Sequence, residues 1–170
     1  MPIKILVTLD GSAFSEQILE TAVRMAGRTQ AEVSLLRVVP PARGSASRAL
    51  TYDRRVDERA LGFVGDERPE VQVGEVETVD QAAESLAADA MAYLAPLRHR
   101  FEGDGESVQC LVREGEHAEE QILRCAEELG VDMIAMATHG RGGLAHLLTG
   151  SVVDKVMRAG MFPVLLYRPA

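Results

Sequence analysis

A glycine-rich stretch near the carboxyl end of the chain carries most of the side chains that could hold an anion. Residues 136–153 contain glycines at 140, 142, 143 and 150, and beside them Thr138, His139, Arg141, Thr149 and Ser151. Glycine lets a backbone approach a phosphate closely, and free N–H groups at the start of a helix point at such an anion. The stretch therefore predicts a phosphate-binding loop, with a simple tight turn as the alternative.

Two regular elements should hold this loop in place. The apolar run 133–137 precedes it and is typical of a strand buried on both faces, and a helical pattern follows from Ser151 to Ala159. In open α/β sheets, ligands bind beyond the carboxyl ends of the strands. The order of strand, glycine loop and helix start thus favours a ligand site at one edge of a parallel sheet.

The same stretch resembles the signature of the universal stress protein family, which is a glycine, two residues, a glycine, nine residues and then Gly-Ser or Gly-Thr. Here Gly140 is followed by nine residues and then Gly150-Ser151, while Ala137 stands where the family has its first glycine. The resemblance covers nearly the whole chain apart from a segment at about residues 41–80. It implies an ATP-binding regulatory protein of the stress response, with slow or no hydrolysis.

The resemblance also implies which residues meet the nucleotide. An aspartate at the position of Asp10 lines the family's pocket, and the backbone at the position of Val38 meets the adenine. The same pocket would include Met136, Ala137, His139, Gly140, Arg141, Gly143, Gly150, Ser151 and Val152. Asp10 could also help to hold Mg²⁺. From the residues alone, a turn or helix-cap role remains the alternative for Asp10, as core packing does for Val38.

The first third of the chain predicts a β-α-β unit. Residues 3–9 form a short apolar run that Asp10-Gly11-Ser12 ends, and apolar residues then recur at helical spacing from Phe14 to a stop at Gly27. Residues 33–39 form a second strand, closed by two prolines. Such a unit argues for a parallel sheet with a right-handed crossover.

The rest of the chain predicts further alternation after a break. Residues 41–80 mix arginines with carboxylates and have few apolar residues, so we expect a mobile surface excursion there. A helix should follow from Gln81 to about Arg100, with a kink or early end near Ala95 because Pro96 lies inside it. A turn at 103–105, a strand at 108–112, a helix from Ala118 to a stop at Gly130, and strands at 133–137 and 163–167 complete the pattern.

The expected fold is therefore an α/β sheet of five parallel strands alternating with four helices. The resemblance implies the strand order 3-2-1-4-5 in an open sheet with helices on both faces, the adenine-nucleotide alpha-hydrolase-like fold. That order sets the first and fourth strands side by side, so the Asp10 turn and the Gly140 loop would face one crevice. The last strand would lie at an edge, and the family commonly pairs through it, which implies a homodimer through residues 163–168.

Composition limits the class of protein. A length of 170 residues favours one domain, and a net charge of −8 argues against a general affinity for nucleic acid or an anionic membrane. No apolar run reaches the length of a membrane span, and the first residues do not have the pattern of a signal peptide. Two cysteines, Cys110 and Cys125, make neither a disulfide framework nor a zinc site. These features favour a cytoplasmic protein with reduced thiols.

Rival functions have weaker support. Gly140, Gly142 and Ala145 match the dinucleotide fingerprint in spacing, but the next strand has no carboxylate at its end to bind a ribose. Gly-Lys-Ser/Thr and Gly-x-Ser-x-Gly motifs are absent from the sequence. Two alternatives to an ATP-binding protein stay open: a nucleotide-free interaction protein of the same fold, and a binder of AMP or cyclic AMP.

Overall fold

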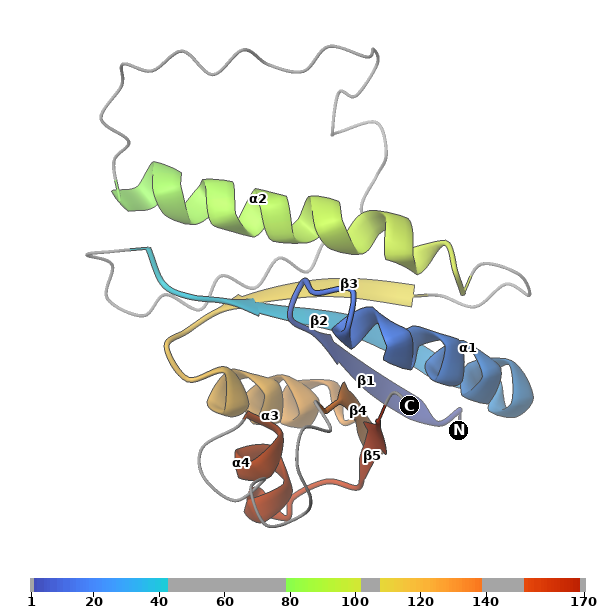
Figure 1. Cartoon of the computed structure of the whole chain (residues 1–170). Helices are drawn as coiled ribbons and strands as arrows, with labels where there is room; N and C mark the ends of the chain where they lie inside the picture. Colours follow the sequence, from blue (N-terminus) through green and yellow to red (C-terminus); the bar gives the residue numbers. More distant parts are fainter. Residues whose placement is uncertain (1, 43–78, 102–107, 139–151, 169–170) are drawn as a thin grey trace.

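The computed structural model describes residues 2–42, 79–101, 108–138 and 152–168. These residues form alternating strands and helices (Figure 1). The strands are β1 (Lys4–Leu9), β2 (Glu32–Val39), β3 (Val108–Glu114), β4 (Met133–Ala137) and β5 (Val164–Tyr167). The helices are the short 3₁₀ turn η1 (Ser15–Gln17), α1 (Ile18–Thr29), α2 (Val79–Arg98), α3 (Ala118–Leu129) and α4 (Val152–Ala159).

The strands make one parallel sheet in the order β3-β2-β1-β4-β5, so the predicted topology is confirmed. β1 lies at the centre, where Ile5 pairs with Val33 of β2 on one side and with Met133 of β4 on the other. The order reverses its direction between β1 and β4. Their carboxyl ends therefore come together although they lie far apart in the sequence, and this is the point where open α/β sheets hold ligands.

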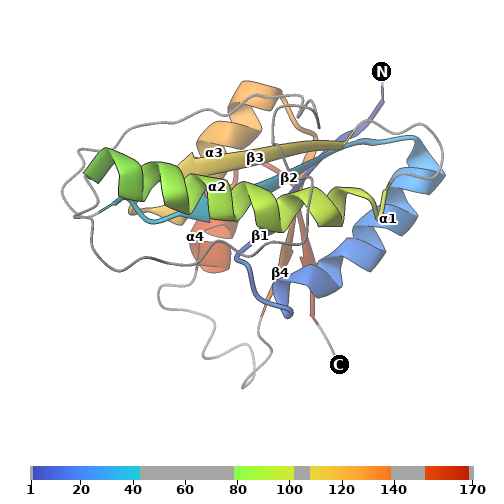
Figure 2. The same cartoon turned by 90° about the horizontal axis from the view of Figure 1, so that it is seen from above.

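Helices cover both faces of the sheet, α1 and α2 on one face and α3 and α4 on the other (Figures 1 and 2). Successive strand residues point to opposite faces, so Leu6 and Leu36 pack under α3 while Val7 and Leu35 pack under α1 and α2. Both faces are buried, which is why the strand sequences are largely apolar, most completely in β4, instead of alternating strictly. The two sides are called the α1–α2 face and the α3–α4 face below.

The predicted stop of the first helix at Gly27 is wrong, because α1 continues to Thr29. Gly27 is exposed inside the helix, and a Cβ there would meet no atom within 4 Å. The left-handed cap falls on Gln30, at φ 51°, which donates its N–H to the carbonyl of Ala26. Because α1 ends this late, only Ala31 separates its cap from β2. The short connection to the sheet therefore sets the end of the helix, although a glycine within a helix costs about 1 kcal/mol.

The predicted early end near Ala95 is also wrong, since α2 continues through Pro96 to Arg98. Proline removes one N–H, whose partner would be the carbonyl of residue 92, and Ala92 is exposed so that water can bind there. Beyond the proline, Leu97 and Phe101 are buried. Their burial holds the last turn of the helix against the sheet.

The other described elements agree with the sequence, with small differences at their ends. α3 ends before Gly130, which takes a left-handed φ of 59°, as predicted, and β3 continues past Val112 to Glu114. Cys125 is fully buried on the apolar side of α3. The predicted turn at 103–105 and residues 43–78 of the excursion lie outside the described residues. Among the helices described here, none has the length and hydropathy needed to cross a membrane.

Candidate functional site

A cavity of about 160 Å³ lies at the carboxyl ends of β1, β2 and β4. Its position is the topological switch point between β1 and β4, with walls from α3 and the start of α4. The described residues that line it are Thr8, Leu9, Asp10, Ser15, Leu36, Val38, Ala118, Ile122, Met136, Ala137, Val152 and Val153.

Most of this lining is aliphatic. Leu36 and Val38 come from alternate positions of β2 and face the cavity from the same side of the sheet, beside Met136 of β4. Ligand pockets commonly enclose about 300–1,000 Å³. The cavity is therefore a small apolar recess, suited to a flat ring and not to a whole extended ligand.

The polar rim of the cavity is the turn that follows β1. One carboxylate oxygen of Asp10 accepts hydrogen bonds from the N–H of Ser12 at 2.9 Å and from its hydroxyl at 2.6 Å. The Ser15 hydroxyl donates to the carbonyl of Ser12 at 2.9 Å and accepts from the N–H of Asp10 at 3.3 Å. Asp10 thus holds a compact turn through one carboxylate oxygen.

This carboxylate is ionised at neutral pH. Partial burial raises the pKa of Asp10, but hydrogen bonds from Ser12 and Ser15 outweigh burial and hold the pKa below its ordinary value of 3.8. Asp10 itself is exposed, so it can meet a cation or a hydroxyl group of a ligand. The sequence left a turn role and a ligand role open for Asp10, and its geometry is compatible with both.

The walls from α3 and α4 are joined beside the cavity by an ion pair. Lys155 of α4 donates a hydrogen bond to the carboxylate of Glu119 on α3. That hydrogen bond is the main cause of a lowered pKa for Glu119. The pair lies one helical turn from Val152 and next to Ala118, both of which line the cavity. The ion pair links α4 to the first turn of α3.

Five of the residues predicted to bind a nucleotide line this one cavity: Asp10, Val38, Met136, Ala137 and Val152. They come from the turn after β1, from the strands β2 and β4, and from the helix α4, so the topology and not the sequence order brings them together. The other predicted residues, His139, Gly140, Arg141, Gly143, Gly150 and Ser151, lie outside the described residues. Thr138, the last described residue before them, donates its N–H to the carbonyl of Tyr167 at 2.9 Å.

The sequence analysis missed the remaining lining residues. Alternation in a strand could have found two of them, because Thr8 and Leu36 each lie two positions before a predicted residue. Helical spacing joins Ala118 to Ile122 in the same way. Ser15 had no such signal, since its place depends on the hydrogen bonds of the turn.

Among the described residues that line the cavity, Asp10 is the one carboxylate that could bind a metal. Within the described ranges, no group of three or more His, Cys, Asp or Glu side chains is arranged to hold a metal ion. Mg²⁺ is often bound by one or two carboxylates with the remaining ligands from phosphate and water. The residues present therefore fit a magnesium ion only if a bound phosphate shares it with Asp10.

Comparison with known proteins gives consistent matches along the chain. The sequence model of the universal stress protein family matches residues 1–168. Universal stress protein YxiE of Bacillus subtilis is 33% identical over 165 residues, which covers 97% of this chain and 98% of that protein.

Solved structures give the same match in three dimensions. The structure of the hypothetical protein MJ0577, from Methanocaldococcus jannaschii, matches with a TM-score of 0.65 and 24% identity, over 100% of this chain and 98% of that one. A universal stress protein in complex with cAMP matches with a TM-score of 0.62 and 16% identity, over 99% and 98% of the two chains. These likenesses show that the fold is the adenine-nucleotide alpha-hydrolase-like fold.

Proposed function

The chain belongs to the universal stress protein family, and from this premise we propose that it is a single-domain cytoplasmic regulatory protein that binds ATP. The observation that carries the proposal is the cavity at the carboxyl ends of β1, β2 and β4, which lies at the switch point where open α/β sheets hold their ligands. Slow or no hydrolysis is expected, because only Asp10 among the described lining residues is a charged group.

In the proposed complex the adenine ring enters the aliphatic recess beside Val38 and Met136. Because the cavity holds about 160 Å³, the sugar and phosphates would extend out of it past Asp10 and Ala137. Gly140, Gly143, Gly150 and Ser151 would hold the phosphates through backbone N–H groups and a hydroxyl, with His139 and Arg141 beside them. A magnesium ion, when bound, would be shared between Asp10 and the phosphates.

Cyclic AMP and AMP are the next candidate ligands. A universal stress protein of the same fold has been solved with cAMP, which supports the adenine-nucleotide class without selecting its member. Mass spectrometry of ligand released from freshly purified, denatured protein would identify the bound nucleotide. Calorimetry with ATP, AMP and cyclic AMP should then give the tightest binding for ATP. Tighter binding of cyclic AMP would replace ATP in the proposal.

Acidic substitutions test the phosphate site. Gly140→Glu or Ser151→Glu should abolish nucleotide binding with an unchanged far-ultraviolet circular dichroism spectrum, because each places a negative charge where the phosphates are proposed to lie. Gly74→Glu in the excursion adds the same charge elsewhere and should leave affinity unchanged. If the first two variants bind ATP as the parent does, a nucleotide-free interaction protein becomes the better proposal.

We also propose a homodimer through residues 163–168. β5 is an edge strand, and Leu166 on it is 38% exposed, which leaves an apolar edge open to pairing. Sedimentation at micromolar concentration should give a dimer for the parent and a monomer for Leu166→Lys. A monomeric parent would remove this part of the proposal.

A further inference from the structure

Behind the Asp10 turn, on the α1–α2 face, a guanidinium group is packed against the backbone. Gly11 has a φ of +89°, and a Cβ placed on it would lie 2.7 Å from Nη2 and 2.9 Å from Cζ of Arg37. Arg37 is the β2 residue that pairs with Leu9, the last residue of β1. The side chain of Arg37 therefore fills the space behind the turn directly after the strand ends.

The same guanidinium also lies over an aromatic ring. The Cζ atom of Arg37 lies over the ring of Tyr93, 4.8 Å from its centroid, and Tyr93 belongs to α2. A cation at this distance from a ring face is attracted by the ring's quadrupole. Arg37 thus lies against both Gly11 of the turn and Tyr93 of the helix.

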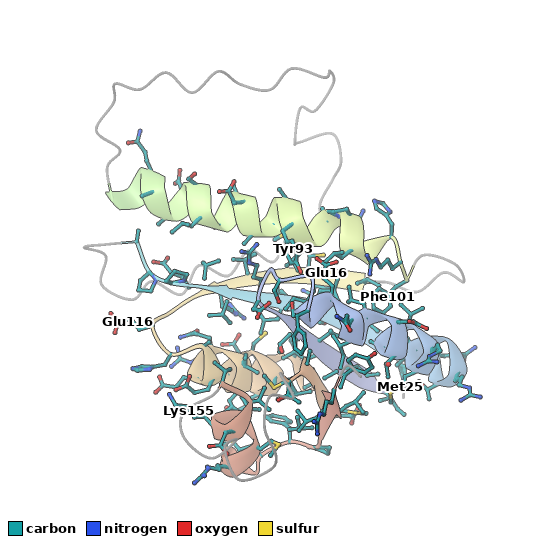
Figure 3. All side chains as sticks on the ribbon, viewed as in Figure 1. Glu16, Met25, Tyr93, Phe101, Glu116 and Lys155 are labelled. Atoms are coloured by element: carbon teal, nitrogen blue, oxygen red, sulfur yellow. The ribbon has the colours of Figure 1, made fainter. Side chains whose placement is uncertain are left out.

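The Tyr93 hydroxyl is buried at this point, near Glu16 (Figure 3). Burial first, and then the negative charge of Glu16, raises the pKa of Tyr93 to about 12. Ser15 and Glu16 lie nearby, but no described residue makes a hydrogen bond of normal geometry to this hydroxyl. The ring, and not the hydroxyl, is therefore the part of Tyr93 that holds Arg37.

α2 reaches the same turn a second time. Arg100, just after the end of α2, forms an ion pair with Glu16 at 3.6 Å. Glu16 follows Ser15, whose hydroxyl is hydrogen-bonded to the N–H of Asp10. Tyr93 of α2 therefore reaches this turn through Arg37, and Arg100 reaches it through Glu16, while Asp10 and Ser15 of the same turn line the cavity.

We propose that Arg37 and Tyr93 are a pair of positioning residues that holds the Asp10 turn in place and so couples the position of α2 to the nucleotide pocket. The proposal rests on the proposed function for its second half. Val38 follows Arg37 and lines the cavity from the opposite face of β2. Two adjacent residues of β2 therefore contact the pocket and the turn, Val38 the pocket and Arg37 the turn.

Amide hydrogen exchange in the nucleotide-free protein tests the first half. Tyr93→Leu and Arg37→Met should each speed exchange at residues 11–17 by about tenfold, because the turn loses its backing and opens locally more often. Tyr93→Phe keeps the ring and should exchange like the parent. Arg24→Met removes an exposed guanidinium from α1 and serves as the matched control. Unchanged exchange in both Tyr93→Leu and Arg37→Met would overturn the proposal.

Calorimetry with ATP tests the second half on the same four variants. Tyr93→Leu and Arg37→Met should weaken ATP binding about fivefold, while Tyr93→Phe and Arg24→Met should bind as the parent does. Faster exchange with unchanged affinity would overturn the coupling and leave the pair with a local role. If the parent binds no adenine nucleotide, the proposed function fails, while the exchange measurements still decide whether the pair holds the turn.

Discussion

The two faces of the sheet differ most where β1 and β2 end. On the α3–α4 face, Leu36 and Val38 line an aliphatic cavity, and on the α1–α2 face Arg37 between them packs against Gly11 and Tyr93. Three consecutive residues of β2 therefore take part in two different kinds of contact, apolar packing on one face and a cation–π contact on the other. The α3–α4 face provides shape and apolar surface, while the α1–α2 face provides charge, an aromatic ring and a close backbone contact.

This difference indicates that one face provides the apolar surface for a ligand and the other holds the polar turn in position. An aliphatic recess accepts a ring but cannot orient it strongly, since dispersion and burial have little direction. The orientation must come from groups with fixed positions, and Asp10 is one of them through its hydrogen bonds to Ser12. Substitutions on the α3–α4 face should therefore change affinity directly. Those on the α1–α2 face should change stability and the order of the turn, and should change affinity only through the turn.

The largest effect is expected from a charge inside the cavity. Val38→Glu should weaken ATP binding at least a hundredfold, about 2.7 kcal/mol, because a carboxylate would displace the ring and repel the phosphates. Leu86→Glu adds the same charge at an exposed position of α2, away from the cavity, and should bind as the parent does. Calorimetry on both variants checks the prediction. Retained binding in Val38→Glu would mean that the ring lies elsewhere.

A methyl group on the α1–α2 face should lower stability next most strongly. Gly11→Ala combines a left-handed φ of +89° with a contact to Arg37 at 2.7 Å, so the free energy of unfolding should fall by about 2–3 kcal/mol. Gly130→Ala is the matched control, because Gly130 also has a positive φ but its Cβ would meet open space. It should cost about 1–2 kcal/mol. Urea unfolding of both variants measures the difference.

The double variant Gly11→Ala/Arg37→Ala separates the two causes. Removal of the guanidinium relieves the contact and leaves the backbone strain, so the added methyl should cost less in this background than alone. An equal cost in both backgrounds would show that Arg37 does not press on the turn.

The sequence predicted the fold well because parallel strands buried on both faces leave continuous apolar runs. It located Asp10, Val38 and Met136 through strand ends and a family resemblance, and the structure brings them to one cavity. It could not predict the contact of Arg37 with Tyr93, which depends on how α2 packs after a long excursion. Its errors at Gly27 and Pro96 share one feature, since tertiary structure overrode a local signal for a helix end. At Gly27 the short connection to β2 decides the end, and at Pro96 the burial of Leu97 and Phe101 does.

A smaller effect is expected from the rim carboxylate, and it depends on pH. The folded-state pKa of Asp10 is lowered, so its contribution to stability is present above the ordinary value of 3.8 and is lost as the pH falls through the lower folded-state pKa. Asp10→Asn should lower the free energy of unfolding at pH 7 by less than about 1 kcal/mol, since the group is exposed. Urea unfolding should show this difference shrinking below about pH 3.8. A difference that grows on acidification would contradict the assignment.

The smallest effect is expected at Ala137, where the two faces meet. Its side chain lines the cavity and also packs against the cluster under α1 and α2, and it stands where the family signature has glycine. Its φ is negative, so the backbone does not require glycine there, and the methyl group acts only by filling space. Ala137→Gly should tighten ATP binding about threefold, roughly 0.65 kcal/mol, by widening the approach to the sugar and phosphates.

The same substitution should lower stability, because glycine in a strand costs about 0.5–1 kcal/mol in backbone entropy. Affinity and stability would then move in opposite directions in one variant, which a general loosening of the fold would not produce. Ala135→Gly, two residues earlier on β4 and outside the cavity lining, should lose stability with unchanged affinity. Calorimetry and urea unfolding on both variants decide the matter. Unchanged or weaker binding in Ala137→Gly would refute the steric account, and binding gained only in that variant would make Ala137 the residue that switches nucleotide binding off.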